Sequence, residues 1–181
     1  CTSVFTALKI VQDKNNHTLI RTMMAPVPLR SYMAQTIASF LLVSLVQITV
    51  VLLLLRYGLR LYMGESVFHF FVLMAVFSLV SVSLGILVSS FSRNIVQAAL
   101  FGFCVIPPLG MLGGAYFPLD WAPEIIKILS QFDPVTWMMQ GAERLLHDQP
   151  LAAIGREISV LLLFAAVFFL LGTVRKTDIA K

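Results

Sequence analysis

Four long stretches without a charged residue constrain the fold of this 181-residue chain more than any other feature. A helix needs about 20 mostly apolar residues to cross a bilayer, and backbone polar groups in lipid have to be paired internally, which favours helices over open strands. The stretches are Ser31–Leu55, Ser66–Ser92, Asn94–Leu119 and Ile158–Val174. We therefore predict an all-α, polytopic transmembrane helical bundle with complete spans over residues 31–55, 67–92, 94–117 and 157–174.

The first ten residues are apolar at their start but too short to cross a membrane by themselves. We expect residues 1–10 to be the end of an earlier span, although a lipid-modified Cys1 is an alternative, and residues 11–30 to form a cytoplasmic segment. Cys1 and Cys104 give no disulfide framework and no zinc-binding spacing. The net charge of +4 comes from dispersed residues, so nucleic acid is not an expected partner.

The loop charges predict the orientation of the bundle, because Lys and Arg collect on short cytoplasmic loops. If the four spans alternate, eight basic residues fall on the side that holds residues 11–30, Arg93 and the C-terminus. The opposite side receives five basic residues and most of the acids. We therefore expect residues 11–30 and the C-terminus to be cytoplasmic in a multi-pass cell-membrane protein, as in a bacterial plasma membrane.

Small residues recur at helical spacing inside two of the predicted spans. Ser81, Gly85 and Ser89 are spaced by four residues, and so are Gly110 and Gly114. Such a face lets two helix backbones approach closely, either within the subunit or in a dimer. A polar lining for a substrate path is the alternative. The spans themselves lack the charged relay residues that proton-driven carriers keep in mid-membrane.

The adjacent prolines Pro107 and Pro108 lie inside the third predicted span. Each removes a backbone donor and clashes with the preceding turn. We expect a kinked or broken helix that enters as Ile95–Ile106 and continues loosely to Tyr116; whether the break gates transport is left open.

Two segments between spans have the pattern of short helices. Residues 118–150 are predicted to form two extracellular amphipathic helices, the first with an apolar face at Trp121, Ile125 and Leu129. Asp133-Pro134 has the pattern of a cap followed by a proline in the first turn of the second. On the cytoplasmic side, Thr18–Ala25 is predicted to form a short helix that ends at Pro26-Val27-Pro28.

Both segments carry a resemblance to the type 2 ATP-binding-cassette (ABC) exporter permeases. The cytoplasmic segment is similar to the family's coupling region, with His17 at the usual glycine and Ile20 at the usual glutamate. Phe117–Leu146 resembles the family's extracellular Pro…Asn-Pro…Arg-x-Leu-Leu stretch, with Asp133 at the usual Asn. The residues that match the coupling pattern are Asp13, Thr18, Leu19, Met23, Ala25, Pro26 and Arg30.

The resemblance implies the C-terminal part of a six-span permease subunit. The implied partners are a cytoplasmic ABC ATPase, a second permease copy in a homo- or heterodimer, and membrane lipid. The implied ATPase-coupling helix uses Asp13, Lys14, Thr18, Leu19, Arg21 and Met23.

Catalytic and nucleotide-binding motifs are missing from the sequence. There is no G-x-x-x-x-G-K-[ST] phosphate loop, and the histidines are far apart. We therefore expect no enzyme activity and no cofactor in this chain, with ATP and magnesium bound by the partner. An ATP-independent channel or carrier, or a membrane anchor or enzyme subunit, remains an alternative. Neutral polar and aromatic residues in the spans suit an amphiphilic substrate.

Overall fold

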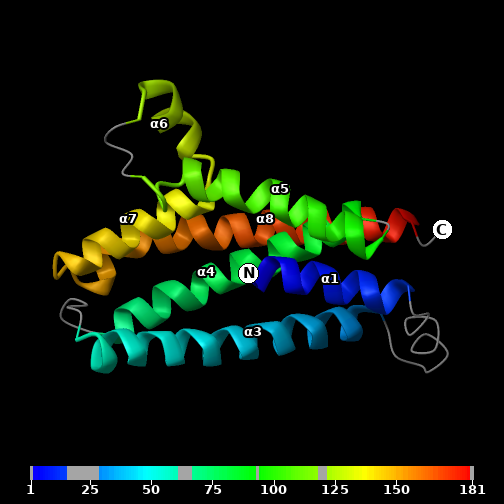
Figure 1. The fold of residues 1–181 in the computed structure, drawn as a ribbon, viewed down its shortest axis with the longest axis horizontal. Helices are drawn as coiled ribbons and strands as arrows, with labels where there is room; N and C mark the ends of the chain where they lie inside the picture. The colour runs from blue at the N-terminus through cyan, green and yellow to red at the C-terminus, as the bar shows by residue number, and fades with distance from the viewer. Residues whose placement is uncertain (1, 16–28, 61–66, 93, 118–121, 180–181) are drawn as a thin grey trace.

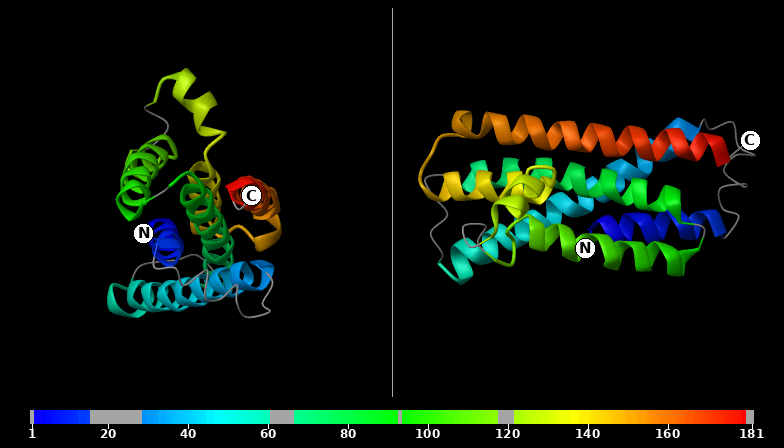
Figure 2. Two further views of the ribbon diagram at one scale, coloured as in Figure 1. Left: turned by 90° about the vertical axis from the view of Figure 1, so that its right-hand side faces the viewer. Right: turned by 90° about the horizontal axis from the view of Figure 1, so that it is seen from above.

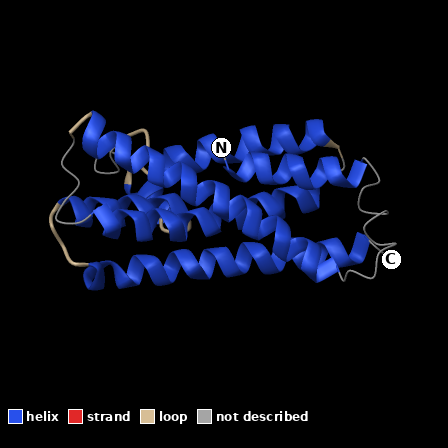
Figure 3. Ribbon diagram, turned by 90° about the horizontal axis from the view of Figure 1, so that it is seen from below, coloured by secondary structure: helices blue, strands red, loops and turns tan. Residues whose placement is uncertain are grey.

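The chain folds as a bundle of long helices that run side by side (Figures 1 and 3). This computed structural model describes residues 2–15, 29–60, 67–92, 94–117 and 122–179, and within these ranges every regular element is a helix. Four helical segments are long and apolar enough to cross a membrane: Ile37–Gly58, Val67–Phe91, Ile95–Leu112 and Leu151–Thr173. The prediction of an all-α membrane bundle is confirmed.

The long helices alternate in direction along the chain. The end of α1, the start of α3, the end of α4, the start of α5 and the end of α8 all lie at one end of the bundle (Figure 1). Two of the long helices adjoin a short turn of another helix type: a π-helical turn follows α3 and a 3-10 turn precedes α8. The elements are α1 (Thr2–Asn15), α3 (Leu29–Leu53), η1 (Leu54–Gly58), α4 (Val67–Phe91), α5 (Ile95–Leu112), α6 (Glu124–Ser130), α7 (Pro134–Leu146), η3 (Leu151–Ile154) and α8 (Gly155–Ile179).

Helix α4 is the centre of the bundle. It packs most extensively on α8 and α1, and it also contacts α3, α5 and α7. Leu73 and Val80 of α4 join Leu161 of α8 in the largest core cluster. Further along α4, Val88 packs with Ala7 of α1. The buried residues of α4 thus lie on several faces of the helix, as expected of a helix surrounded by protein.

Helix α1 is longer than the sequence indicated. It continues to Asn15, so residues 11–15, assigned to the cytoplasmic segment, prolong the helix expected to end at residue 10. Ala7 and Val11 are buried, with Ala98 of α5 in the same cluster. Their helical spacing keeps one face of α1 against α4 and α5, which explains why the helix persists. The predicted Thr18–Ala25 helix lies outside the described residues.

Helix α5 passes through both prolines without a break, so the broken form of the kinked or broken helix expected at Pro107-Pro108 was wrong. The helix runs from Ile95 to Leu112, and the chain leaves it at Gly113 and Gly114, where Gly114 has a φ of 79°. Neighbouring helices let membrane helices tolerate proline, and only glycine adopts the left-handed conformation at low cost. The glycines therefore end the helix, five residues before the predicted boundary at residue 117.

Two helices do occur between α5 and α8, but they differ in their surroundings. Helix α6 projects away from the bundle (Figure 1), and its Ile125 and Ile128 are exposed. Helix α7 instead packs on α4 and α8. Asp133 caps α7 by accepting a hydrogen bond from the Val135 N–H at 3.0 Å, with Pro134 in the first turn. The predicted cap is confirmed.

Candidate functional site

The small residues Ser81, Gly85 and Ser89 of α4 lie in two different environments. A Cβ atom on Gly85 would lie 2.6 Å from the Ser3 carbonyl oxygen and 2.7 Å from Thr6 Cβ, both in α1. Ser89 is buried and donates its hydroxyl to the Ile86 carbonyl oxygen at 2.7 Å. Gly85 thus lies in a close helix–helix contact. Ser81, one turn earlier, lines a groove instead.

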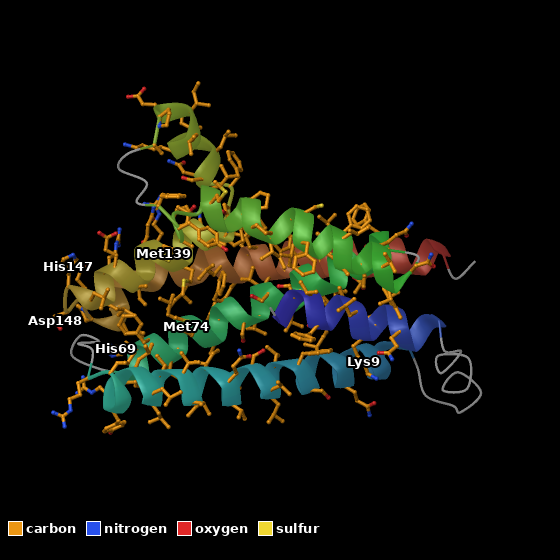
Figure 4. The ribbon with its side chains drawn as sticks, in the orientation of Figure 1. Lys9, His69, Met74, Met139, His147 and Asp148 are labelled. Atoms are coloured by element: carbon orange, nitrogen blue, oxygen red, sulfur yellow. The ribbon has the colours of Figure 1, made fainter. Side chains whose placement is uncertain are left out.

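This groove lies between α3 and α4 and has a volume of about 470 Å³. Its walls are mainly apolar, and Met74, labelled in Figure 4, belongs to the α4 wall. Gln47 of α3 is exposed beside it, near the middle of the Ile37–Gly58 span. The uncharged polar residues that line the groove are Ser44, Gln47, Ser78 and Ser81. An apolar groove with a few neutral hydrogen-bonding groups suits an uncharged or amphiphilic molecule.

The glycines at the end of α5 each make a different contact. A Cβ on Gly110 would lie 2.7 Å from the ring of Tyr116, so this glycine lets the chain after α5 fold back. A Cβ on Gly113 would collide with Val135 and would come within 2.9 Å of Asp133 Oδ2. Gly114, with its positive φ, is needed for the turn itself. The end of α5 is therefore in contact with the start of α7, a contact that sequence spacing did not indicate.

Asp133 is an almost fully buried carboxylate at that contact. Its Oδ1 atom accepts the Val135 N–H, whereas its Oδ2 atom is buried and has no hydrogen-bond partner among the described residues. Burial raises the pKa of Asp133 from 3.8 to about 6, and the Val135 hydrogen bond partly opposes this rise. Asp133 thus holds its proton to a higher pH than an exposed aspartate does.

A second buried acid, Glu157, joins α7 to α8. Its side chain is 1% exposed, and its Oε1 atom lies 3.2 Å from Nη1 of Arg144. The same Nη1 donates to the Ala153 carbonyl oxygen at 3.2 Å, and the Arg156 guanidinium lies 5.3 Å from the centre of the Trp137 ring. The ion pair is close but not aligned as a hydrogen bond, since neither Glu157 oxygen has a hydrogen-bond partner in the part of the chain that the structure describes.

Sequence reasoning missed the Arg144–Glu157 pair. Glu157 comes directly before the uncharged stretch that begins at Ile158 and is the first residue of the span predicted over residues 157–174. The structure buries it between helices, within the apolar segment Leu151–Thr173. Arg144, at the end of an amphipathic helix, was the available signal: an arginine facing an uncharged span needs an acidic partner.

Only two of the residues expected to couple the bundle to a partner fall within the described part of the chain. Asp13 and Lys14 belong to the last turn of α1. Thr18, Leu19, Arg21 and Met23 fall outside the described residues. Figure 4 places Lys9 towards the end of the bundle where α1 finishes and His69, His147 and Asp148 at the opposite end.

Two known proteins are similar to this chain in sequence. The linearmycin resistance permease protein LnrN of Bacillus subtilis is 26% identical over 164 residues, which are 90% of this chain and 42% of the relative. Nodulation protein J of Rhizobium leguminosarum bv. viciae is 28% identical over 99 residues, 55% of this chain and 38% of the relative. The chain thus spans about two-fifths of the length of these relatives. No solved structure matches.

A family profile described as "ABC-2 family transporter protein" matches residues 2–174. The match includes all four membrane-spanning segments, the whole of α1 and both α-helices between α5 and α8. The chain belongs to the ABC-2 family of transporter proteins.

Proposed function

We propose that this chain forms the membrane-spanning permease part of an ABC exporter, which moves substrate out of the cytoplasm with energy from a separate ATPase subunit. The profile match over residues 2–174 carries this proposal, and a relative that is itself named a permease supports it. The sequence lacks a phosphate-binding loop. We therefore assign ATP and magnesium to the partner.

We assign the end of the bundle where α1 finishes to the cytoplasm. The end of α1, the start of α3 and the end of α8 meet there (Figure 2, right), and the more basic loops belong to that end. Cysteines introduced at Lys14 and Asp148 should react with impermeant reagents from opposite sides of the membrane. Reaction of both from one side would exclude this orientation.

Residues 16–28, which connect α1 to α3, are the proposed docking segment for the ATPase. The expected docking residue Leu19 and the exposed Leu59, which follows η1 at the opposite end of the bundle, offer a matched pair. In vesicles containing both subunits, Leu19→Asp should abolish co-purification of the ATPase and substrate-stimulated ATP hydrolysis, while Leu59→Asp preserves both. Equal behaviour of two well-inserted variants would overturn the coupling role.

The α3–α4 groove is the proposed contact site for an uncharged or amphiphilic substrate. Gln47 supplies an amide in mid-span, where hydrogen-bonding groups are otherwise costly to expose. Gln47→Leu should lower substrate-stimulated ATP hydrolysis without changing the basal rate. Thr49→Val is the control, since Thr49 is on the same helix and donates to its own backbone at Leu45. Equal effects of the two substitutions would show that the groove is not a contact site for the substrate.

A second permease copy is the proposed partner within the membrane. Phe5 of α1 and Phe103 of α5 are exposed, and a groove of about 440 Å³ is lined by Cys104 and other residues of α5 together with Phe91 of α4. Helices α1 and α5 are adjacent, so these residues can share one interface. A bifunctional maleimide should cross-link two chains through Cys104, and Cys104→Ser should abolish the product.

A further inference from the structure

Helix α7 is attached to the bundle at both of its ends, by different chemistry. Its N-terminal end meets α5 through Asp133 and Gly113, and its C-terminal end meets α8 through Arg144 and Glu157. Between them, Gly141 approaches Leu73 of α4, because a Cβ there would lie 3.1 Å from a Leu73 methyl carbon. The two attachments can therefore be compared on the same helix.

The attachment to α8 combines several favourable contacts. Arg144 contacts both Glu157 and the Ala153 carbonyl oxygen, and Arg156 stacks over Trp137. Trp137 in turn donates its Nε1–H to the Gln131 carbonyl oxygen at 2.9 Å. Both Glu157 oxygens are buried without a hydrogen bond among the described residues, but the side chain of Arg144, which is 42% exposed, lies 3.2 Å away and compensates the Glu157 charge. Loss of that partner from a buried carboxylate is strongly destabilising. Separation of α7 from α8 is therefore unfavourable.

The attachment to α5 contains an unfavourable element. Asp133 Oδ2 is buried without a hydrogen bond among the described residues, and it faces the backbone of Gly113 at the end of α5. A charged carboxylate in this position loses hydration that only Val135 partly replaces. If α7 moved away from α5, water could reach Oδ2 and remove the penalty.

Charged neighbours do not offset this burial. Burial and the Val135 N–H are the two causes that move the pKa of Asp133. Helix α5 has no charged residue between Ile95 and Leu112. The ionisable groups on the surrounding elements are Cys104 on α5 and Tyr116 after it, Glu124 and Lys127 on α6, Glu143, Arg144, His147 and Asp148 on or after α7, His69 on α4, and Arg156 and Glu157 in the first turn of α8.

We propose that Asp133 is a proton-sensitive latch between α5 and α7, and that α7 stays bound to α8 when the latch opens. The biological role of the latch rests on the proposed transport function, since an exporter has to open its outer end. The physical argument for the latch does not depend on that function. Protonation closes the latch by neutralising the buried carboxyl. Loss of the proton favours an open state in which α5 moves relative to the α7–α8 pair.

The direction of the pH effect follows from the higher pKa of the buried state. The closed contact is most stable well below pH 3.8, where Asp133 is neutral in both states. Its stability falls as the pH rises from the ordinary value of 3.8 towards the buried value of about 6. The difference between these two pKa values corresponds to an increase of about a hundredfold in the ratio of the open to the closed population.

Two spin-label distances in lipid discs test the latch directly. One pair joins Met111→Cys on α5 to Met139→Cys on α7, and the other joins Met139→Cys to Leu163→Cys on α8; all three positions are exposed. Cys1 and Cys104 are replaced by serine. The α5–α7 pair should gain a longer-distance population as the pH rises from 4 to 7.5, whereas the α7–α8 pair should not change.

Two substitutions at the latch supply the control. Asp133→Asn and Asp133→Ser keep a capping side chain but cannot ionise, so both should abolish the pH dependence of the α5–α7 distance. A pH-independent distance in the parent protein, a pH response that survives in either variant, or equal shifts in both pairs would overturn the proposal. No ATPase is needed for this measurement, so its failure is distinguishable from failure of the exporter function, which the ATP hydrolysis assay tests.

Discussion

Helices α3 and α4 are matched in length and hydropathy yet differ sharply in burial. Each has 25 residues, and the apolar windows in both have a mean hydropathy of 2.6. Half of the α4 window is buried within the subunit, compared with 11% of the α3 window. Hydropathy therefore identifies a helix that can cross the membrane, but it does not distinguish a central helix from a peripheral one.

Side-chain size explains much of this difference. Gly85 allows the α1 backbone to approach α4 closely, and buried serines such as Ser90 satisfy their hydroxyls on their own helix. On α3, Leu42, Val46 and Val50 are exposed. Helix association in lipid depends on close packing and not on the removal of apolar surface from water. Small residues on several faces thus make α4 a centre of packing.

The largest expected effect comes from filling the α4–α1 contact. Gly85→Leu would place side-chain atoms where the Ser3 carbonyl and Thr6 now lie, so the free energy of unfolding should fall by about 3 kcal/mol or more. Gly58→Leu is the control, because nothing lies within 4 Å of a Cβ there. Unfolding in mixed micelles measures both. Equal losses would contradict the assignment of α4 as the packed helix.

Truncation of a leucine should have a smaller effect that still separates the two helices. Leu73 of α4 is fully buried, whereas Leu42 of α3 is 64% exposed. Leu73→Ala should lower the free energy of unfolding by about 2 kcal/mol, because the cavity loses packing contacts. Leu42→Ala should change it by less than about 0.5 kcal/mol. A cost at Leu42 as large as at Leu73 would show that α3 is packed in the same way as α4.

The smallest expected effect is that of replacing two glycines of α8 with alanine, which should change the thermal unfolding midpoint differently at the two positions. A Cβ on Gly172 would lie 3.0–3.2 Å from atoms of Ile86 and Leu87 of α4, whereas nothing lies within 4 Å of a Cβ on Gly155. Gly172→Ala should lower the thermal unfolding midpoint in detergent, because backbone atoms have to shift. Gly155→Ala should leave it unchanged or raise it, since alanine favours the helix by up to about 1 kcal/mol. Stabilisation by both would show that the α4–α8 contact is loose.

The sequence predicts most of the membrane bundle because the relevant signal is local. Uncharged length places the four spans, and Asp133-Pro134 places the start of α7. The end of α5 was misplaced because Gly113 and Gly114 end the helix. Its continuity through Pro107 and Pro108 was not predicted, since tolerance of proline depends on neighbouring helices that lie elsewhere in the sequence. The contacts of α7 were unpredictable in detail for the same reason. Gly113 meets Asp133, and Arg144 meets Glu157, only after three helices have assembled.

The π-helical turn at the end of α3 affects where the fold can tolerate the insertion or deletion of a residue. The Leu59 N–H bonds to the Leu54 carbonyl oxygen across five residues, so this turn contains one residue more than an α-helical turn. Loss of one residue from Leu54–Gly58 would restore an α-helical turn without rotating the preceding part of α3. The same loss in the middle of α4 would turn Gly85 away from α1 by about 100°. Length variants of this chain should therefore survive at the end of α3 and be eliminated within α4.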